Sequence, residues 1–380
     1  MQGVFRTTQM KRGSVSNRLL DRYAGIVALR AISVFNKRRP RPALFRTIGI
    51  LASPTVGDTL LTSGAVRDLR RAFPEARVIY FSTPGASSAA VKLIPGIHEI
   101  QAIDILKPFL TIRTMRRCKL DLLVDFTQWQ RVTAFYSGLS GAGHRLGFRS
   151  AGQHRHWLYD ESVPHSADAH ETENFRALVR ALGVKATHPP TLNASYNEPL
   201  VEKPRIIFHP WATGDHAFLR EWATGNWVEL AKKLAADETV FLITGTRDEL
   251  SRSVDLVSRL RYAGLTAEPF PALDGLFGLS RQIQRSELVV SVNTGVMHLA
   301  ALLGARTISL NGPTATHRWG PVGPKSCSVE PRGGGGGYLH FGFEFAGNPQ
   351  DTMQRIYVED VFSAARELVP RLQKAVMANV

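Results

Sequence analysis

Short apolar runs rich in β-branched residues recur along the chain, and each is followed by a segment of helical length. In the first half these runs predict strands at residues 45–52, 77–82, 98–103 and 120–126. In the second half they predict strands at residues 205–209, 239–244, 286–293 and 307–310. Helices are expected between them, since Leu61, Ala65 and Leu69 for example recur every fourth residue and form one apolar face. The alternation predicts an α/β protein with two doubly wound, Rossmann-like domains in tandem.

Two segments depart from this alternation. The polar stretch from His144 to Pro204 contains Pro164, Pro189, Pro190 and Pro204 among its residues and predicts a domain junction rather than a further repeat. Five consecutive glycines at Gly333–Gly337 predict a mobile surface loop. Ligands in doubly wound sheets bind beyond the carboxyl ends of the strands, so the expected site is a cleft between the domains. The predicted boundaries are a basic arm at residues 1–42, a first domain at 43–195, a second domain at 196–355 and a final helix at 356–380.

The net charge of +15 is concentrated in the arm, because residues 1–46 hold eleven Lys and Arg but the single acid Asp21. This placement argues against a nucleic-acid-binding core and favours a basic arm on an ordinary enzyme body. Arg18, Arg22 and Arg30 are interleaved with apolar residues, so the arm is either a helix resting on an anionic membrane surface or a flexible solubilising tail.

The arm contains no apolar run long enough to span a bilayer. Secretion is not expected, since Arg30 breaks the apolar stretch and no clear cleavage site follows. Two cysteines, Cys118 and Cys327, are too few for a disulfide framework or a zinc cluster. A reducing compartment, and therefore a cytoplasmic protein, is the expectation.

Candidate chemistry is concentrated where the strand predicted at 286–293 meets the following helix. Asn293 and Thr294 are residues typical of a helix start, and no carboxylate follows in the first helical turn. Such a helix end offers free backbone N–H groups and a positive dipole. The pattern therefore predicts a seat for a phosphate.

The order Asn293-Thr294-Gly295-Val-Met-His298-Leu-Ala resembles the Asp-(Thr/Ser)-Gly-x-x-His-x-Ala signature of the heptosyltransferases, glycosyltransferase family nine. In that family the segment holds the diphosphate of a nucleotide-sugar donor. Asn293 replaces the family's Asp. Further segments match the family in order, and together they cover most of residues 45–370: Val56–Thr62, His209–Thr213, Arg220–Trp222, Thr244–Glu249 and Met353–Val361.

The resemblance implies a GT-B type, inverting, metal-independent glycosyltransferase with the acceptor on the first domain and the donor on the second. The implied donor is ADP-heptose, a co-substrate rather than a cofactor. The implied acceptor is lipopolysaccharide core or another lipid-linked glycan at the cytoplasmic face of the inner membrane, where the enzyme would be peripheral. The sequence also contains no Asp-x-Asp triplet and no metal-ligand spacing. Two alternatives stay open: a GT-B enzyme using a UDP- or GDP-sugar, and a catalytically silent sugar-nucleotide-binding protein, which Asn293 favours.

By position, the resemblance makes Asp58 the general base, although an Asp there can also be a helix cap. Arg220 stands where the family has a lysine and would neutralise the leaving diphosphate together with Thr213; the alternative is a solvated surface Arg. Glu249 would face the nucleoside ribose, or else be an acid at a helix N-terminus.

The remaining candidates belong to the phosphate seat. Gly295 would let a phosphate approach the backbone, and the Thr294 hydroxyl would donate a hydrogen bond to it. His298 lies one helical turn further and would reach the donor, unless it is a packing residue. Asn293 keeps the shape of the family's Asp without its charge. The resemblance also implies that the final helix returns to brace the first domain.

Overall fold

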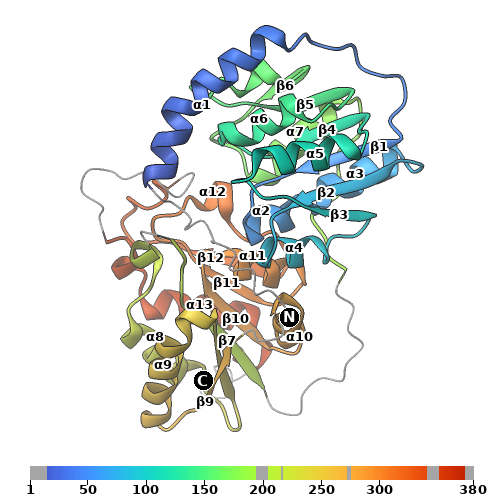
Figure 1. Ribbon diagram of the computed structural model, residues 1–380. Coiled ribbons are helices and arrows are strands. Elements are labelled where there is room, and N and C mark those ends of the chain that lie inside the picture. Colours follow the sequence, from blue (N-terminus) through green and yellow to red (C-terminus); the bar gives the residue numbers. More distant parts are fainter. Residues whose placement is uncertain (1–14, 194–203, 215–216, 272–274, 340–350, 373–380) are drawn as a thin grey trace, which may run out of the picture.

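The computed structural model describes residues 15–193, 204–214, 217–271, 275–339 and 351–372. The chain forms two lobes, one above the other in Figure 1, and each is built on a six-stranded sheet. All strand pairs in both sheets are parallel. Helices cover both faces of the sheets. This architecture confirms the predicted pair of Rossmann-like domains.

The sheet of the first lobe has the strand order β3-β2-β1-β4-β5-β6. Chain progression changes direction between β1 and β4, and this switch point is where doubly wound folds bind ligands. The strands of this lobe are β1 (Thr47–Leu51), β2 (Arg77–Ser82), β3 (Glu99–Ala102), β4 (Leu122–Asp125), β5 (His144–Arg149) and β6 (Glu161–Pro164). Its helices are α1 (Val15–Phe35), α2 (Val56–Leu61), α3 (Ser63–Ala72), α4 (Ala86–Val91), α5 (Pro108–Arg117), α6 (Arg131–Leu139), η1 (Arg155–Leu158) and α7 (Glu171–Ala181).

Side chains of successive strand residues pack on opposite faces of this sheet, as the pleat requires. Val78 and Tyr80 of β2 lie in the core under α3 and α7. Ile79 and Phe81 lie in the core under α5 and α6. Both faces of the strand are thus covered, which explains why it is recognisable as a continuous apolar run.

The expectation that residues 144–204 hold no further repeat is wrong. This stretch contributes β5, β6 and α7 to the first lobe. Charged residues in these elements interrupt the apolar pattern that predicts a strand. Arg145 of β5, for example, is almost fully buried because it pairs with Asp160 at 2.7 Å. The first strand of the second lobe begins at Arg205.

The sheet of the second lobe has the order β12-β11-β10-β7-β8-β9, with its switch point between β10 and β7. Its strands are β7 (Arg205–His209), β8 (Val240–Gly245), β9 (Thr266–Pro271), β10 (Leu288–Val292), β11 (Thr307–Leu310) and β12 (Ser326–Val329). Its helices are η2 (Ala217–Arg220), α8 (Thr224–Leu234), η3 (Arg247–Glu249), α9 (Leu250–Tyr262), α10 (Gly275–Gln284), α11 (Gly295–Leu302), α12 (Thr316–Trp319), η4 (Met353–Arg355) and α13 (Val358–Leu368).

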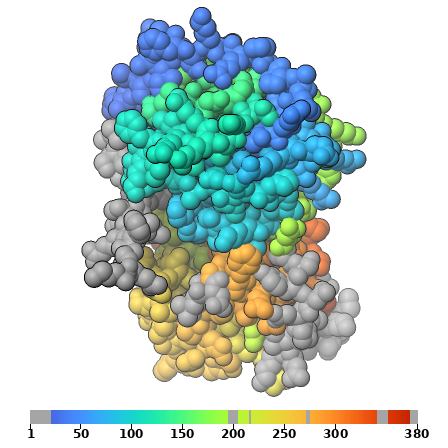
Figure 2. Space-filling view, turned by 45° about the vertical axis from the view of Figure 1, so that its right-hand side comes forward, coloured from blue at the N-terminus to red at the C-terminus, as the bar shows by residue number. Residues whose placement is uncertain are grey.

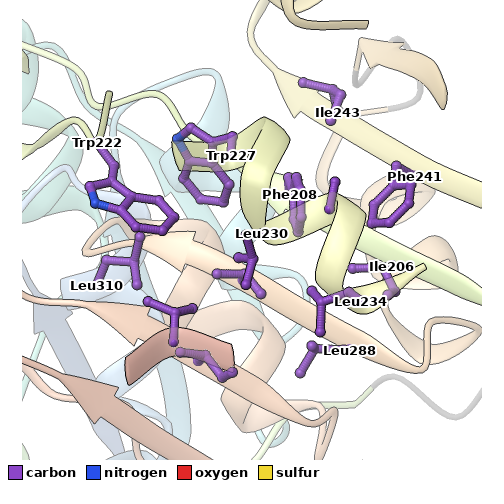
Figure 3. Close-up of a cluster of buried hydrophobic side chains, with 14 of the residues drawn as sticks. Ile206, Phe208, Trp222, Trp227, Leu230, Leu234, Phe241, Ile243, Leu288 and Leu310 are labelled. Carbon is purple, nitrogen blue, oxygen red and sulfur yellow. The ribbon is translucent and has the colours of Figure 1, made fainter. Parts of the chain in front are cut away.

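Aromatic side chains dominate the core under α8 (Figure 3). The rings of Trp227 and Phe208 lie 4.9 Å apart between centroids, and Trp222 meets Trp227 edge-on at 5.4 Å. Leu230 and Leu234 of α8 continue the same apolar stripe onto the sheet. Each of these side chains buries a large apolar surface, so the core fixes α8 and the loop before it.

The described part of the last helix does not brace the first lobe, contrary to what the resemblance implied. Val361 and Ala365 of α13 belong to the core of the second lobe. The indole Nε1 of Trp222 donates to the Ile356 carbonyl at 2.9 Å and ties the start of this segment to the same lobe. Of the helix predicted at 356–380, the structure describes residues 356–372, and α13 packs there on the second lobe.

The glycine run Gly333–Gly337 is tied to the loop after β11. Gly337 N donates to the Gly312 carbonyl at 3.1 Å. A Cβ on Gly336 would lie 2.6 Å from that carbonyl oxygen. Gly337 also has a positive φ of 73°. These glycines permit close backbone packing, which the prediction of a slack loop did not anticipate.

The described part of the basic arm is a helix docked on the first lobe. Leu29 of α1 is fully buried against Ala134, Leu158 and Tyr159. The arm at residues 15–42 is therefore not a free tail.

Candidate active site between the lobes

The two lobes meet closely where α2 packs against α11. A Cβ on Gly295 would lie 2.7 Å from Val56 Cβ and 3.1 Å from Gly57 N. A Cβ on Gly57 would lie 2.9 Å from His298 Cδ2. Since α2 follows β1 and α11 follows β10, the carboxyl ends of both sheets face this contact. Two glycines thus allow the predicted catalytic turn and the predicted phosphate seat to touch.

Asp58 lies in the first turn of α2, next to this contact, and is only 8% exposed. The N-cap of α2 is Thr55, whose hydroxyl accepts a hydrogen bond from the Asp58 backbone N–H at 3.2 Å. The cap position is therefore filled without the Asp58 side chain, so the carboxylate is not required there as a cap.

The N-terminus of α11 combines free backbone N–H groups with uncharged side chains. Thr294 is the N-cap but makes no side-chain cap bond, and its buried hydroxyl has no hydrogen-bond partner within the described residues. Burial, together with the charge of His170, lowers the pKa of His298 to about 3. His298 is therefore neutral at pH 7, and its Nδ1 also lacks a partner in the described part of the chain.

The side chain of Asn293 is hydrogen-bonded to the end of α12. Its Nδ2 donates to the Trp319 carbonyl at 2.8 Å and to Asn311 Oδ1 at 3.1 Å. Asn311 Oδ1 also accepts from Ser309 Oγ at 2.6 Å. Both partners of Asn293 are acceptors, and a carboxylate has no hydrogen to donate to them. The amide is thus the side chain that fits this network.

Thr213 and Arg220 are brought together at the loop after β7, where the Arg220 guanidinium donates to the Thr213 carbonyl. Sequence reasoning missed the neighbouring Glu221, which accepts from Ala212 N at 3.0 Å. Glu221 also pairs with Arg252, whose guanidinium lies 4.1 Å from the centroid of the Trp211 ring. These contacts fix the loop that carries Thr213.

Glu249 forms a capping box at the start of η3. Its Oε2 accepts from Thr246 N at 2.7 Å, and the Thr246 hydroxyl accepts from the Glu249 backbone N–H. The interpretation of Glu249 as an acid at a helix N-terminus thus describes its geometry. A role toward a ribose stays a prediction that would use its other carboxylate oxygen.

A second set of contacts joins the lobes through a buried ion pair that the sequence did not reveal. Arg318 of α12 and Glu171 of α7 are both fully buried, with Nη2 and Oε2 2.9 Å apart. Glu171 also meets His165 Nε2 at 2.9 Å. Burial acts to raise the pKa of Glu171, but hydrogen bonds and charges from His165 and Arg318 outweigh it and hold that pKa low. His170 Nε2 lies 3.1 Å from the Gly320 carbonyl oxygen nearby.

The described residues contain no group of three or more His, Cys, Asp or Glu side chains arranged to hold a metal ion. Within the same residues, no helix combines the length and apolar character needed to cross a bilayer.

Two Rossmann-like lobes whose sheets face each other by their carboxyl ends have the architecture of the GT-B fold. The model of glycosyltransferase family 9 (heptosyltransferase) matches residues 110–331. The chain belongs to this family, and it is a glycosyltransferase.

Solved structures with the same fold include several heptosyltransferases. The Escherichia coli ADP-heptose LPS heptosyltransferase II has a TM-score of 0.69 at 18% identity and covers 87% of this chain and 99% of its own. E. coli heptosyltransferase WaaC with ADP has a TM-score of 0.66 at 19% identity, and the match covers 85% of this chain and 100% of WaaC. A family 9 glycosyltransferase from Veillonella parvula has a TM-score of 0.69 at 16% identity, and the match covers 89% of this chain and 100% of the Veillonella chain. The comparison with curated protein sequences gives no match.

The fold is also shared by the iron-containing, dodecameric glycosyltransferase TibC from E. coli, with a TM-score of 0.56 at 13% identity, covering 87% of this chain and 80% of its own. Because the described residues offer no set of ligands for iron, no residue of this part of the chain is assigned to a metal.

Proposed function

We propose that this glycosyltransferase moves heptose from ADP-heptose, with inversion and without a metal, onto lipopolysaccharide core or another lipid-linked glycan. The observation that carries the proposal is the contact between α2 and α11 at Gly57 and Gly295. It brings the first turn of α2, which carries Asp58, against the N-terminus of α11, and a helix N-terminus is suited to a diphosphate. The donor is suggested by related folds, since WaaC has been seen with ADP-2-deoxy-2-fluoro heptose.

The donor would lie on the second lobe with its diphosphate at the N-terminus of α11. The backbone N–H groups near Gly295 and the unpartnered Thr294 hydroxyl would bind its oxygens. Arg220 and Thr213 would approach from the loop after β7, and Glu249 would meet the ribose. Positive charge and amide hydrogens would thus stabilise the leaving diphosphate, which supports a mechanism without a metal.

In the proposed step the acceptor hydroxyl oxygen attacks the anomeric carbon while Asp58 takes its proton. The bond from that carbon to the diphosphate oxygen breaks, and the electron pair leaves with ADP. Attack from the face opposite the leaving group inverts the anomeric centre. Neutral His298 would contribute only hydrogen bonding, because its low pKa keeps it uncharged.

Replacing Asp58 with Asn tests this mechanism. We expect the Asp58→Asn protein to fold and to bind ADP-sugar, but to lose about 10²–10⁴-fold in turnover. Transfer from ADP-heptose to a lipid extract is the measurement. Asp255→Asn on α9, where the carboxylate side chain is 59% exposed, is the matched control and should retain full turnover. A fully active Asp58→Asn protein would remove Asp58 from the mechanism.

The alternative donors are separated by ligand binding. A GT-B enzyme for a UDP- or GDP-sugar would be stabilised by that nucleotide-sugar instead of ADP-heptose. A ligand at a hundredfold its dissociation constant adds about 2.7 kcal/mol to the stability, so thermal shifts with the three donors distinguish them.

The transfer would take place at the cytoplasmic face of the inner membrane, with the enzyme bound peripherally. The support for this location is the basic arm at residues 1–42, of which the structure describes 15–42.

A further inference from the structure

Helix α1 presents two opposite faces with different chemistry. Positions 21, 25, 29 and 32 follow helical spacing and face the lobe: Asp21 accepts from Arg131 N at 3.0 Å, and Leu29 is fully buried. The opposite face carries Tyr23, Val27, Ala31 and Val34, also at helical spacing. No described residue covers that second face.

The outer face of α1 is unusually apolar for a protein surface. Tyr23 is 64%, Val27 68% and Val34 74% exposed, and Phe35 next to them is 88% exposed. A contiguous apolar stripe of this kind usually marks an interaction site.

The charge around this stripe is of one sign. Arg22 and Arg30 are exposed on α1, and Lys37 and Arg38 follow its end. The single acid of residues 1–46, Asp21, lies on the inner face in contact with α6. The outer face therefore combines apolar side chains with cations and has no carboxylate of its own.

Contacts at both ends hold α1 in a fixed orientation. At one end Asp21 binds Arg131 N and Val132 N, at 3.0 and 3.2 Å. At the other end Arg39 N donates to Asp160 Oδ1 at 2.8 Å. In Figure 2 the blue residues of α1 and the segment after it lie along the upper rim of the first lobe. The apolar face is thus held outward and is not free to fold back onto the lobe.

We propose that the outer face of α1 lies on an anionic lipid bilayer, with Tyr23, Val27 and Val34 at the boundary between headgroups and acyl chains and the flanking arginines on lipid phosphates. A helix with one apolar face and a basic rim is the structure that binds in the plane of such a surface. Anionic headgroups supply the charge that complements these cations.

The anchoring of α1 gives the bilayer contact a direction. Asp21 binds the start of α6, which follows the carboxyl end of β4. That end of the sheet faces the second lobe, beside Asp58. A protein resting on α1 would therefore hold the entrance between its lobes near the lipid surface. This consequence rests on the proposed lipid-linked acceptor, whereas bilayer binding itself does not.

The test uses the full chain and vesicles of phosphatidylcholine, alone or mixed with phosphatidylglycerol, in a sedimentation assay. Binding is expected only with phosphatidylglycerol and should weaken as salt is added. Arg22→Gln with Arg30→Gln should weaken it about 30-fold, as expected for the loss of two charges near an anionic surface. Val27→Ser with Val34→Ser should also weaken binding clearly, and neither pair alters a buried side chain.

A matched control is available on α9 of the second lobe. Tyr262 is 96% exposed there, and the Arg259 side chain is 59% exposed. Tyr262→Ser with Arg259→Gln removes one aromatic ring and one charge and should leave vesicle binding unchanged.

Equal losses from the α1 and α9 variants, or no preference for anionic vesicles, would overturn the proposal. So would binding that needs Arg22 and Arg30 but tolerates serine at 27 and 34, since that pattern indicates an acidic protein partner rather than a bilayer. Vesicle binding without any sugar transfer would leave this inference standing while the proposed function fails.

Discussion

Asn293 is the residue at which the chain departs from the signature of its family. Its Nδ2 hydrogens are directed at the Trp319 carbonyl and Asn311 Oδ1. An aspartate in the same position would place a carboxylate oxygen against two acceptors in a nearly buried site. The departure therefore has a physical basis in the fold.

We predict that Asn293→Asp lowers the free energy of unfolding by about 1–3 kcal/mol, because two hydrogen bonds are lost and a charge is buried beside acceptors. Urea denaturation at neutral pH measures the change. Asn193→Asp, at an exposed position, should stay within about 0.5 kcal/mol of the parent protein. If Asn293→Asp is as stable as the parent, the network does not select the amide.

Two buried histidines make stability depend on pH. Burial lowers the pKa of His209 to about 4 and that of His298 to about 3, from the ordinary histidine value of 6.5. At a pH between the lowered pKa of each folded histidine and 6.5, the unfolded chain binds more protons than the folded one. The contribution of these two histidines to the free energy of unfolding is thus fully present above pH 6.5. It is lost as the pH falls, by about 1.4 kcal/mol per pH unit for each histidine.

Urea denaturation at a series of pH values from 7 to 5 checks this slope. The His209→Gln and His298→Gln proteins should each show a shallower dependence on pH than the parent. An unchanged slope in both would mean that these imidazoles remain accessible to protons in the folded protein.

At the scale of single elements, Asp21 connects two helices. It accepts hydrogen bonds from the first N–H groups of α6 while belonging to α1, so it caps a helix that is remote in sequence. Burial raises the pKa of Asp21, although the charge of Arg131 and both backbone N–H groups act to lower it. The oxygen atoms of Asp21 therefore stabilise the start of α6 mainly as hydrogen-bond acceptors, and its negative charge contributes less.

This balance predicts that Asp21→Ala destabilises the protein by about 1–2 kcal/mol, the usual cost of a lost helix cap. Asp21→Asn keeps an acceptor without the cost of burying a charge and should lose less. Urea denaturation of both variants decides the point. Equal losses from Ala and Asn would assign the effect to charge instead.

Elements with apolar runs were predictable, and those built on paired charges were not. The predicted strands 77–82, 205–209 and 307–310 coincide with β2, β7 and β11. In contrast, β5 contains Arg145, which is buried only because Asp160, fifteen residues further along, neutralises it. A hydrophobic pattern contains no information about such a pairing.

The candidate site likewise contains residues that the sequence predicted and residues that it did not. The placement of Asp58, Gly295 and His298 on the turns after strands followed from their motifs. The ion pair of Glu171 and Arg318 joins residues 147 positions apart, so only tertiary structure brings it together. The sequence likewise gave no sign that Asn293 would bind the end of α12.

At the scale of the whole molecule, this ion pair is buried between the lobes. Glu171 comes from α7 of the first lobe and Arg318 from α12 of the second (Figure 1). Trp319 and Val322 pack against the core of the first lobe beside it. The segment around α12 is therefore a second place, besides the contact of α2 with α11, where the two lobes are held together.

Removing one partner should leave a buried, uncompensated charge. Glu171→Gln is expected to cost about 3–5 kcal/mol, measured by urea denaturation. Replacing both residues together, as Glu171→Leu with Arg318→Met, should recover most of that loss because neither member of the ion pair is left buried without its partner. A double variant as unstable as Glu171→Gln would show that apolar side chains do not fit this interface.

The Gly57 and Gly295 contact gives the enzyme a mechanical constraint. With Val56 Cβ only 2.7 Å from where a methyl group on Gly295 would stand, any larger residue acts as a wedge that pushes the two halves apart. Under the mechanism proposed above, the distance between Asp58 and the donor sugar would thus depend on the absence of side chains at Gly57 and Gly295. Descendants of this protein could retune that distance by one methyl group, while every residue that handles protons or phosphates stays the same.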